Sequence, residues 1–190
     1  MPREGSDSVS PMKALLLTNE YPPHIYGGAG VHVQYLSREL AKLMEVEVRC
    51  FGDQDLPDGN PEVLGLSVDQ EKYTCPKPLR SVFGALQRGL DANTINISAD
   101  LVHCHTWYAY WGGILAKLNY GIPLVVTVHS LEPLRPWKRE QLGRGYDFTC
   151  WLERTALEMA DAVIAVSEET KRDVQHLFQV SDERLHVIYN

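Results

Sequence analysis

Two periods of hydrophobic and polar residues alternate along this 190-residue chain. Short apolar or alternating runs predict strands, and between them apolar residues recur every three or four positions, as on one face of a helix. A repeating strand–helix order is typical of a parallel sheet with helices on both faces. The pattern therefore predicts a doubly wound, parallel α/β fold of about seven strands. The expected strands are residues 13–18, 45–51, 62–68, 101–104, 123–128, 162–166 and 185–189, and the expected helices are residues 30–44, 79–97, 108–120, 148–160 and 168–178.

The composition is that of one soluble domain with its own core, since 44% of the residues are hydrophobic and 23% are charged. A net charge of −7 disfavours a general nucleic-acid or membrane binder, because such partners attract basic surfaces. The four cysteines lack metal-ligand or redox spacing and no apolar leader is present, so we expect a cytoplasmic protein. Residues 1–11 are polar and are expected to form a disordered extension before a domain at residues 12–190.

Three glycines, Gly27, Gly28 and Gly30, follow the first predicted strand and open the next helix. Glycine lets the backbone approach a ligand, and the free N–H groups at a helix N-terminus attract anions. The loop therefore predicts a phosphate site. A dinucleotide-binding domain is an alternative, with Asp53 as the ribose carboxylate, but the glycine spacing is not G-x-G-x-x-G. A helix start that needs glycine only for packing is a third interpretation.

Two histidines, His103 and His105, lie two positions apart at the end of a predicted strand. Both side chains point to one side if the strand continues that far. The pair is compatible with a metal site that His129 joins in space, although no third ligand follows at a recognisable spacing. We favour a core position for His103 and a position facing a ligand cleft for His105, with no metal.

All four tryptophans lie between residues 107 and 151. Flat aromatic side chains bury the apolar faces of sugar rings, but they also pack in cores. Trp111 and Trp151 fall on predicted helices and are assigned to the core. Trp107 and Trp137 fall on predicted loops at strand ends and are assigned to sugar contact.

The segment 126–138 runs from an apolar strand into a loop rich in groups that bind sugars and anions. Ligands of open α/β sheets lie beyond the carboxyl ends of the strands, which favours a functional role for His129. Glu132, Arg135 and Lys138 follow it, and either cation is a candidate ligand for an acceptor phosphate. The alternative is a solvated surface loop whose charges pair with each other.

Longer motifs resemble one protein family. The motifs HSLEPLRPWK (129–138), ERTALEMADAVIAVSEET (153–170) and RLHVIYN (184–190) are similar to those of bacterial glycogen synthases of the actinobacterial type. Some members are assigned as maltose-1-phosphate synthases. The family consists of retaining glycosyltransferases with two Rossmann-like domains, the GT-B architecture. The resemblance covers nearly everything after residue 11 and implies that this chain is the N-terminal, acceptor-side Rossmann-like half.

The resemblance also implies roles for single residues. The backbone N–H groups of Gly27 and Gly28 approach the diphosphate of the donor, His105 lies on the acceptor side, and His129 contacts the transferred sugar. The implied enzyme is a hexosyltransferase that moves glucose from ADP-glucose or UDP-glucose to an α-1,4-glucan or to glucose 1-phosphate. No metal or other cofactor is expected.

Because the chain ends at Asn190, we expect the C-terminal nucleotide-sugar-binding domain to be absent and this chain alone to be inactive. Two other functions stay open. One is a different GT-B transferase that makes sucrose or a glycolipid, against which HSLEPLRPWK argues. The other is a non-catalytic carbohydrate- or nucleotide-binding module.

Overall fold

The structure is a computed structural model that describes residues 11–190, so the expected extension at residues 1–11 lies almost wholly outside the described residues. The strands are β1 (Lys13–Thr18), β2 (Glu45–Cys50), β3 (Asp55–Leu56), β4 (Glu62–Gly65), β5 (Leu101–His105), β6 (Leu124–Val128), β7 (Ala162–Ala165) and β8 (Leu185–Val187). The α-helices are α1 (Gly28–Leu40), α2 (Lys77–Thr94), α3 (Trp107–Tyr120), α4 (Lys138–Leu142), α5 (Gly145–Met159) and α6 (Glu168–Leu177).

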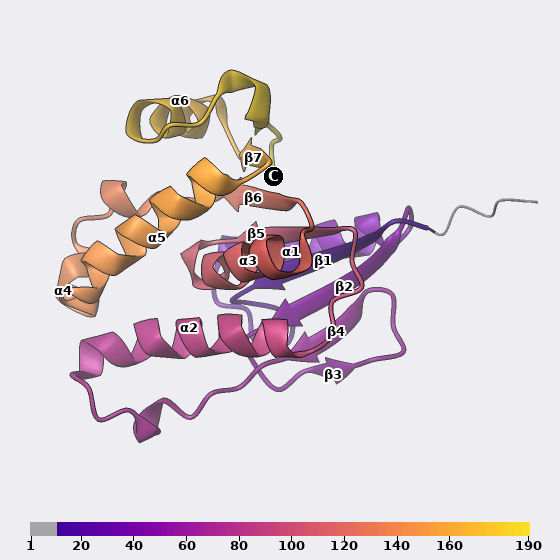
Figure 1. The fold of residues 1–190 in the computed structure, drawn as a ribbon, viewed down its shortest axis with the longest axis horizontal. Coiled ribbons are helices and arrows are strands. Elements are labelled where there is room, and N and C mark those ends of the chain that lie inside the picture. The colour runs from indigo at the N-terminus through magenta and orange to yellow at the C-terminus, as the bar shows by residue number, and fades with distance from the viewer. Residues whose placement is uncertain (1–10) are drawn as a thin grey trace, which may run out of the picture.

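The strands form one sheet in the order β3-β4-β2-β1-β5-β6-β7-β8 (Figure 1). Every neighbouring pair is parallel except β3 and β4. The predicted α/β fold with a mainly parallel sheet is confirmed, with eight strands in place of about seven. No helix among residues 11–190 is long and apolar enough to cross a bilayer.

Both faces of the sheet are buried, which is why the central strands read as continuous apolar runs. Leu15 and Leu17 of β1 belong to the larger core cluster, to which α2, α3 and α5 contribute. Leu16, which points to the opposite face, packs in a smaller cluster with Val33 of α1. Successive side chains of β1 therefore serve two cores, and the helices on the two faces fix the positions of the loops between them.

Several predicted bounds were wrong. No element was predicted between residues 51 and 62 or between residues 128 and 148, but these stretches contain β3 and the helix α4. Strand β5 extends to His105, one residue beyond its predicted end, and α3 begins at Trp107, so Trp107 does not lie on the loop assigned to it. These elements are short or lie at junctions, where pairing with neighbouring segments outweighs local propensity.

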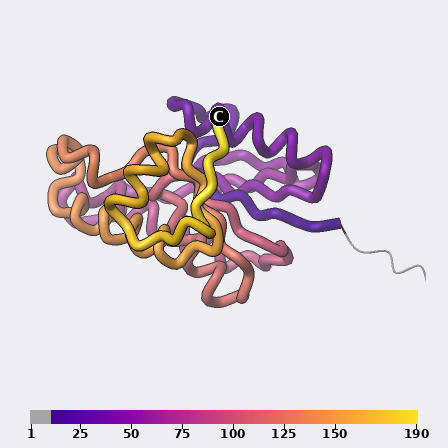
Figure 2. The backbone as a smooth tube through the Cα atoms, turned by 90° about the horizontal axis from the view of Figure 1, so that it is seen from above, coloured from indigo at the N-terminus to yellow at the C-terminus, as the bar shows by residue number. Residues whose placement is uncertain are grey.

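The sheet has a switch point at β1, because the chain proceeds from β1 to β2 on one side and later places β5 on the other. Parallel strands end at a common edge, and ligands of such sheets bind outside that edge at the switch point. The glycine loop, β5 and β6 all deliver residues there. The C-terminal residue Asn190 also reaches the start of α1, and the tube in Figure 2 ends beside that helix.

Candidate functional site

A crevice of about 510 Å³ lies at the carboxyl ends of β1, β5 and β6. The glycine loop forms one wall, and the segment after β6 forms the other. Gly28 and His129, 101 positions apart in the sequence, therefore border the same space. Of the residues predicted for the site, those that line the crevice are Gly27, Gly28, Trp107, His129, Glu132, Arg135 and Lys138.

The glycine loop already holds an anionic group from the chain itself. Gly27 caps α1, and its N–H donates to Glu20 Oε2 at 2.7 Å, while the N–H of Tyr26 donates to the same oxygen at 3.0 Å. A backbone loop that binds a carboxylate in this way has the geometry that a phosphate oxygen requires. A diphosphate that takes the Gly27 N–H must therefore displace the Glu20 carboxylate.

The three glycines differ in what surrounds them. A Cβ at Gly30 would lie 2.7 Å from Glu20 Cβ, whereas a Cβ at Gly28 would meet nothing within 4 Å. Packing therefore explains Gly30, as the third interpretation of the loop proposed, but it does not explain Gly28. The open space beside Gly28 belongs to the crevice and is available to a ligand.

We expect Gly30→Ala to lower the free energy of unfolding by about 1–3 kcal/mol, because the added methyl group overpacks the contact with Glu20. Gly28→Ala is the matched control and should be neutral or slightly stabilising, since it adds a methyl group in open space. Urea unfolding of both variants measures the difference. Equal stability of the two would contradict the proposed crowding at Gly30.

Three imidazoles meet behind the crevice. His105 is fully buried at the end of β5, and its Nδ1 lies 3.2 Å from Nε2 of His129. His32 of α1 packs edge-on against His129, with ring centres 5.0 Å apart. We had expected His105 to face the cleft, and this was wrong. His105 instead lies beneath His129 and contacts it. His103 lies in the core as predicted, with its Nε2 2.7 Å from Thr127 Oγ1.

Burial keeps these histidines neutral. It lowers the pKa of His129 to about 4, with a further contribution from His32, and it lowers the pKa of His103 to about 3. Burial also holds the pKa of His105 well below its ordinary value, and neighbouring imidazoles add to the shift. At neutral pH each ring thus carries one N–H and one lone pair, so His129 can donate a hydrogen bond to a ligand.

The charged residues of the loop after β6 form a buried network. Glu132 is almost fully buried, and its Oε1 accepts from Lys138 Nζ at 2.5 Å. Its other carboxylate oxygen accepts from Thr149, and its backbone N–H donates to Glu153 Oε2 at 2.7 Å. The solvated-loop interpretation is therefore wrong for Glu132 and Lys138, although these charges do pair with each other.

Glu153 adds an acid to this network. Burial raises the pKa of the Glu153 carboxyl to about 8, and the nearby Glu132 raises it further, while the backbone hydrogen bond and Lys138 oppose the shift. The Glu153 carboxyl is therefore mostly protonated at neutral pH. A protonated Glu153 leaves Glu132 as the charge that Lys138 neutralises.

Arg135 is the cation of this loop that stays accessible to a ligand. Its side chain is about one third exposed, donates to Ser130 Oγ at 3.2 Å and lies 3.9 Å from Glu132 Oε1. Neither contact is bidentate, so the guanidinium keeps donors for an anionic ligand in the crevice. Of the two predicted phosphate ligands, the structure thus favours Arg135 over Lys138.

The two tryptophans assigned to sugar contact have different positions. Trp107 is the first residue of α3 and is buried, with its ring stacked on Tyr108 at 4.0 Å between centroids. It still lines the crevice. Trp137 is 57% exposed and is not brought to the crevice.

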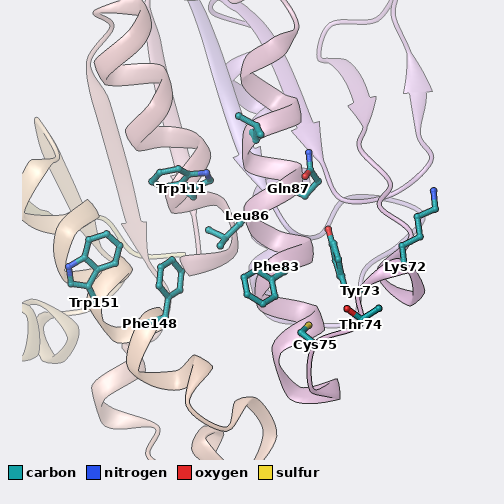
Figure 3. Close-up of a pocket in the computed structure, with 11 residues that line it drawn as sticks. Lys72, Tyr73, Thr74, Cys75, Phe83, Leu86, Gln87, Trp111, Phe148 and Trp151 are labelled. Carbon is teal, nitrogen blue, oxygen red and sulfur yellow. The ribbon is translucent and has the colours of Figure 1, made fainter.

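A second hollow, of about 690 Å³, lies between α2, α3 and α5 (Figure 3). Its walls include Phe83, Trp111, Phe148 and Trp151, which Figure 3 shows around the opening. The core assignment of Trp151 was wrong, since this side chain is 52% exposed. Among the described residues that line it, this hollow has no histidine and no carboxylate, so it suits a polar ligand less well than the crevice does.

Sequence reasoning missed several residues that line the crevice, among them Glu20 and Thr106. Each follows a strand directly or by one residue, the same signal that identified His129. Thr106 has φ 66° and ψ 159°, a conformation that costs a β-branched residue about 1–3 kcal/mol. This strain lies between His105 and Trp107, where it turns the chain from β5 into α3.

The strand order, the crevice at the switch point and the glycine loop together define a Rossmann-like domain, of the kind that forms one half of GT-B glycosyltransferases. Solved structures agree, although their low sequence identity bears on the fold alone. The sucrose-phosphate synthase of Thermosynechococcus elongatus matches with a TM-score of 0.70 at 17% identity, covering 94% of this chain and 48% of that one. An Anabaena protein, HepE, solved with UDP and glucose, matches with a TM-score of 0.59 at 20% identity, covering 94% and 44%.

Sequence comparison gives the family. Residues 26–190 match the model of Glycosyltransferase Family 4, and the chain belongs to this family. An alpha-maltose-1-phosphate synthase of Mycolicibacterium smegmatis is 46% identical over 94% of this chain and 44% of its own length. A glycogen synthase of Mycobacterium tuberculosis is 27% identical over 94% of this chain and 48% of its own. The chain thus spans slightly less than half the length of these curated relatives.

Proposed function

We propose that this chain is the acceptor-side half of a retaining hexosyltransferase that moves glucose from ADP-glucose or UDP-glucose to glucose 1-phosphate. One observation carries the proposal: a single crevice is lined by both the glycine loop and His129. The loop offers N–H groups to the diphosphate of the donor, and His129 offers a donor to a sugar hydroxyl next to it. The second Rossmann-like half would bind the nucleotide.

In the proposed reaction, the bond between the anomeric carbon of glucose and the leaving diphosphate oxygen breaks. The acceptor hydroxyl oxygen bonds to the same carbon on the same face, and its proton leaves with the diphosphate. Negative charge grows on the leaving group while the sugar becomes cationic. Alignment and preorganised hydrogen bonds therefore supply the catalysis, without a nucleophile from the protein.

Arg135 supports a phosphorylated acceptor. It lines the crevice with free donor capacity, whereas the charge of Lys138 is used by Glu132. The 46% identical relative is named alpha-maltose-1-phosphate synthase, which supports the same choice. A glucan acceptor carries no phosphate to pair with the charge of the guanidinium, so the two acceptors can be separated by experiment.

We expect Arg135→Ala in the two-half enzyme to lower turnover with glucose 1-phosphate by about 10- to 100-fold, the loss of a charge-assisted hydrogen bond. Turnover with a malto-oligosaccharide acceptor should change far less. Arg144→Ala, an exposed arginine outside the crevice, is the matched control. Equal losses with both acceptors would remove the phosphate role, and activity with the glucan alone would indicate a glycogen synthase. The 190-residue chain alone should show no turnover.

A further inference from the structure

The imidazoles of His32, His105 and His129 are arranged as ligands of one ion. One nitrogen from each ring lies within 4.8 Å of one nitrogen from each of the others. The ring centres are 5.0, 5.5 and 5.7 Å apart. Three imidazoles that bind a tetrahedral ion at about 2 Å have ring centres about 5 Å apart, so little movement would be needed.

The closest pair already has the required spacing. His105 Nδ1 and His129 Nε2 are 3.2 Å apart, and two nitrogens on one tetrahedral zinc ion lie about 3.3 Å apart. In a hydrogen bond between these two neutral rings, one nitrogen donates its N–H and the other accepts it. An ion would replace that proton and bind the lone pairs of both rings.

Charge and access also suit a cation. Burial lowers the pKa of each of the three histidines, so the rings are neutral at pH 7, the form that binds metals. Three nitrogen ligands without a carboxylate select Zn²⁺, Co²⁺, Ni²⁺ or Cu²⁺ over Mg²⁺ or Ca²⁺. His129 lines the crevice and His32 lines an adjacent hollow beside Gly28, so two of the three ligands can be reached from solvent.

We propose that His32, His105 and His129 form a binding site for a first-row transition-metal ion such as Zn²⁺. The ion binds Nε2 of His129, the ring nitrogen that contacts His105, and in this way inhibits sugar transfer. The inhibition rests on the proposed function, whereas binding of the ion does not. Nε2 of His105 is buried without a hydrogen-bond partner among the described residues, so no second-shell group supports the ligand. The affinity is therefore moderate, which suits a reversible inhibitory site.

Titration of the 190-residue chain with Zn²⁺, followed by calorimetry, tests the site directly. The wild-type chain should bind one ion, and His32→Ala should weaken this binding at least tenfold. His176→Ala removes an exposed imidazole on α6 and should bind like the wild type. His32→Asn, which keeps a polar side chain of similar size, guards against a folding defect and should weaken binding equally. Unchanged affinity in both His32 variants would overturn the site.

The visible absorption of bound Co²⁺ gives a second measurement of the site that does not depend on enzyme activity. Substitution into the wild-type chain should give the intense visible absorption of a tetrahedral ion, and this absorption should be lost in His32→Ala. Inhibition is then measured in the two-half enzyme, as the Zn²⁺ concentration that halves the activity of each variant relative to its own maximum. If the chain binds Zn²⁺ but the enzyme is not inhibited, the proposed inhibition is wrong and the binding site stands. Failure of the proposed transferase would leave the binding result intact.

Discussion

His129→Ala should reduce turnover of the two-half enzyme by about 10²–10³-fold, the loss expected for a preorganised donor in an active site. The side chain is available to the crevice and is held from behind by His105 and His32. Its alanine replacement removes the donor and leaves His105 Nδ1 without this partner. Steady-state kinetics with saturating donor and acceptor measure the effect, while far-UV circular dichroism at the assay temperature checks that the variant is folded.

A control variant and a pH profile separate the role of His129 as a hydrogen-bond donor from the effect of removing any histidine. His186→Ala removes an exposed imidazole on the edge strand β8 and should leave turnover unchanged. The pKa of His129 is lowered to about 4, so the ring is neutral above that pH and loses its role only as the pH falls through 4. Wild-type activity should therefore show no ionisation of His129 between pH 6 and 8. A folded His129→Ala enzyme with near wild-type turnover would contradict the role.

Lys138→Met should destabilise the chain by about 3–5 kcal/mol, because it removes the direct cation partner of the buried Glu132 carboxylate and leaves only the more distant Arg135. Methionine keeps most of the side-chain volume, so the effect is electrostatic rather than a cavity. Urea unfolding of the 190-residue chain measures it. The double variant Lys138→Met/Glu132→Gln should recover much of the loss, since it removes the uncompensated charge together with its partner.

The neighbouring residue offers a matched control. Arg139 pairs with Asp147 at 2.5 Å, but both side chains are about half exposed. Arg139→Met should therefore have a small effect on stability, because solvent already screens the pair. If the Lys138 and Arg139 variants lost equal stability, the buried network around Glu132 would not be the reason for the effect.

The helices and strands with strong periodicity were predicted well, and the junctions were predicted poorly. The central strands β1 and β6 are mostly apolar, as their burial on both faces requires. The short strand β3 and the short helix α4 have no such run and form because neighbouring elements pair with them or pack on them. His105 illustrates the same limit, since it was expected to face the cleft, whereas β5 extends by one residue and places it in the interior.

The sequence by itself determined the α/β class, the glycine loop at a helix start and the polar segment after β6, because these features are encoded in residues close together along the chain. Only the tertiary structure decided which groups satisfy one another. Glu20 binds the N–H of Gly27, His105 supports His129, and Lys138 neutralises Glu132 inside the protein. The burial and the hydrogen-bond partners of these residues depend on how the sheet and the covering helices bring distant segments together. The local periodicity of the sequence does not encode that arrangement.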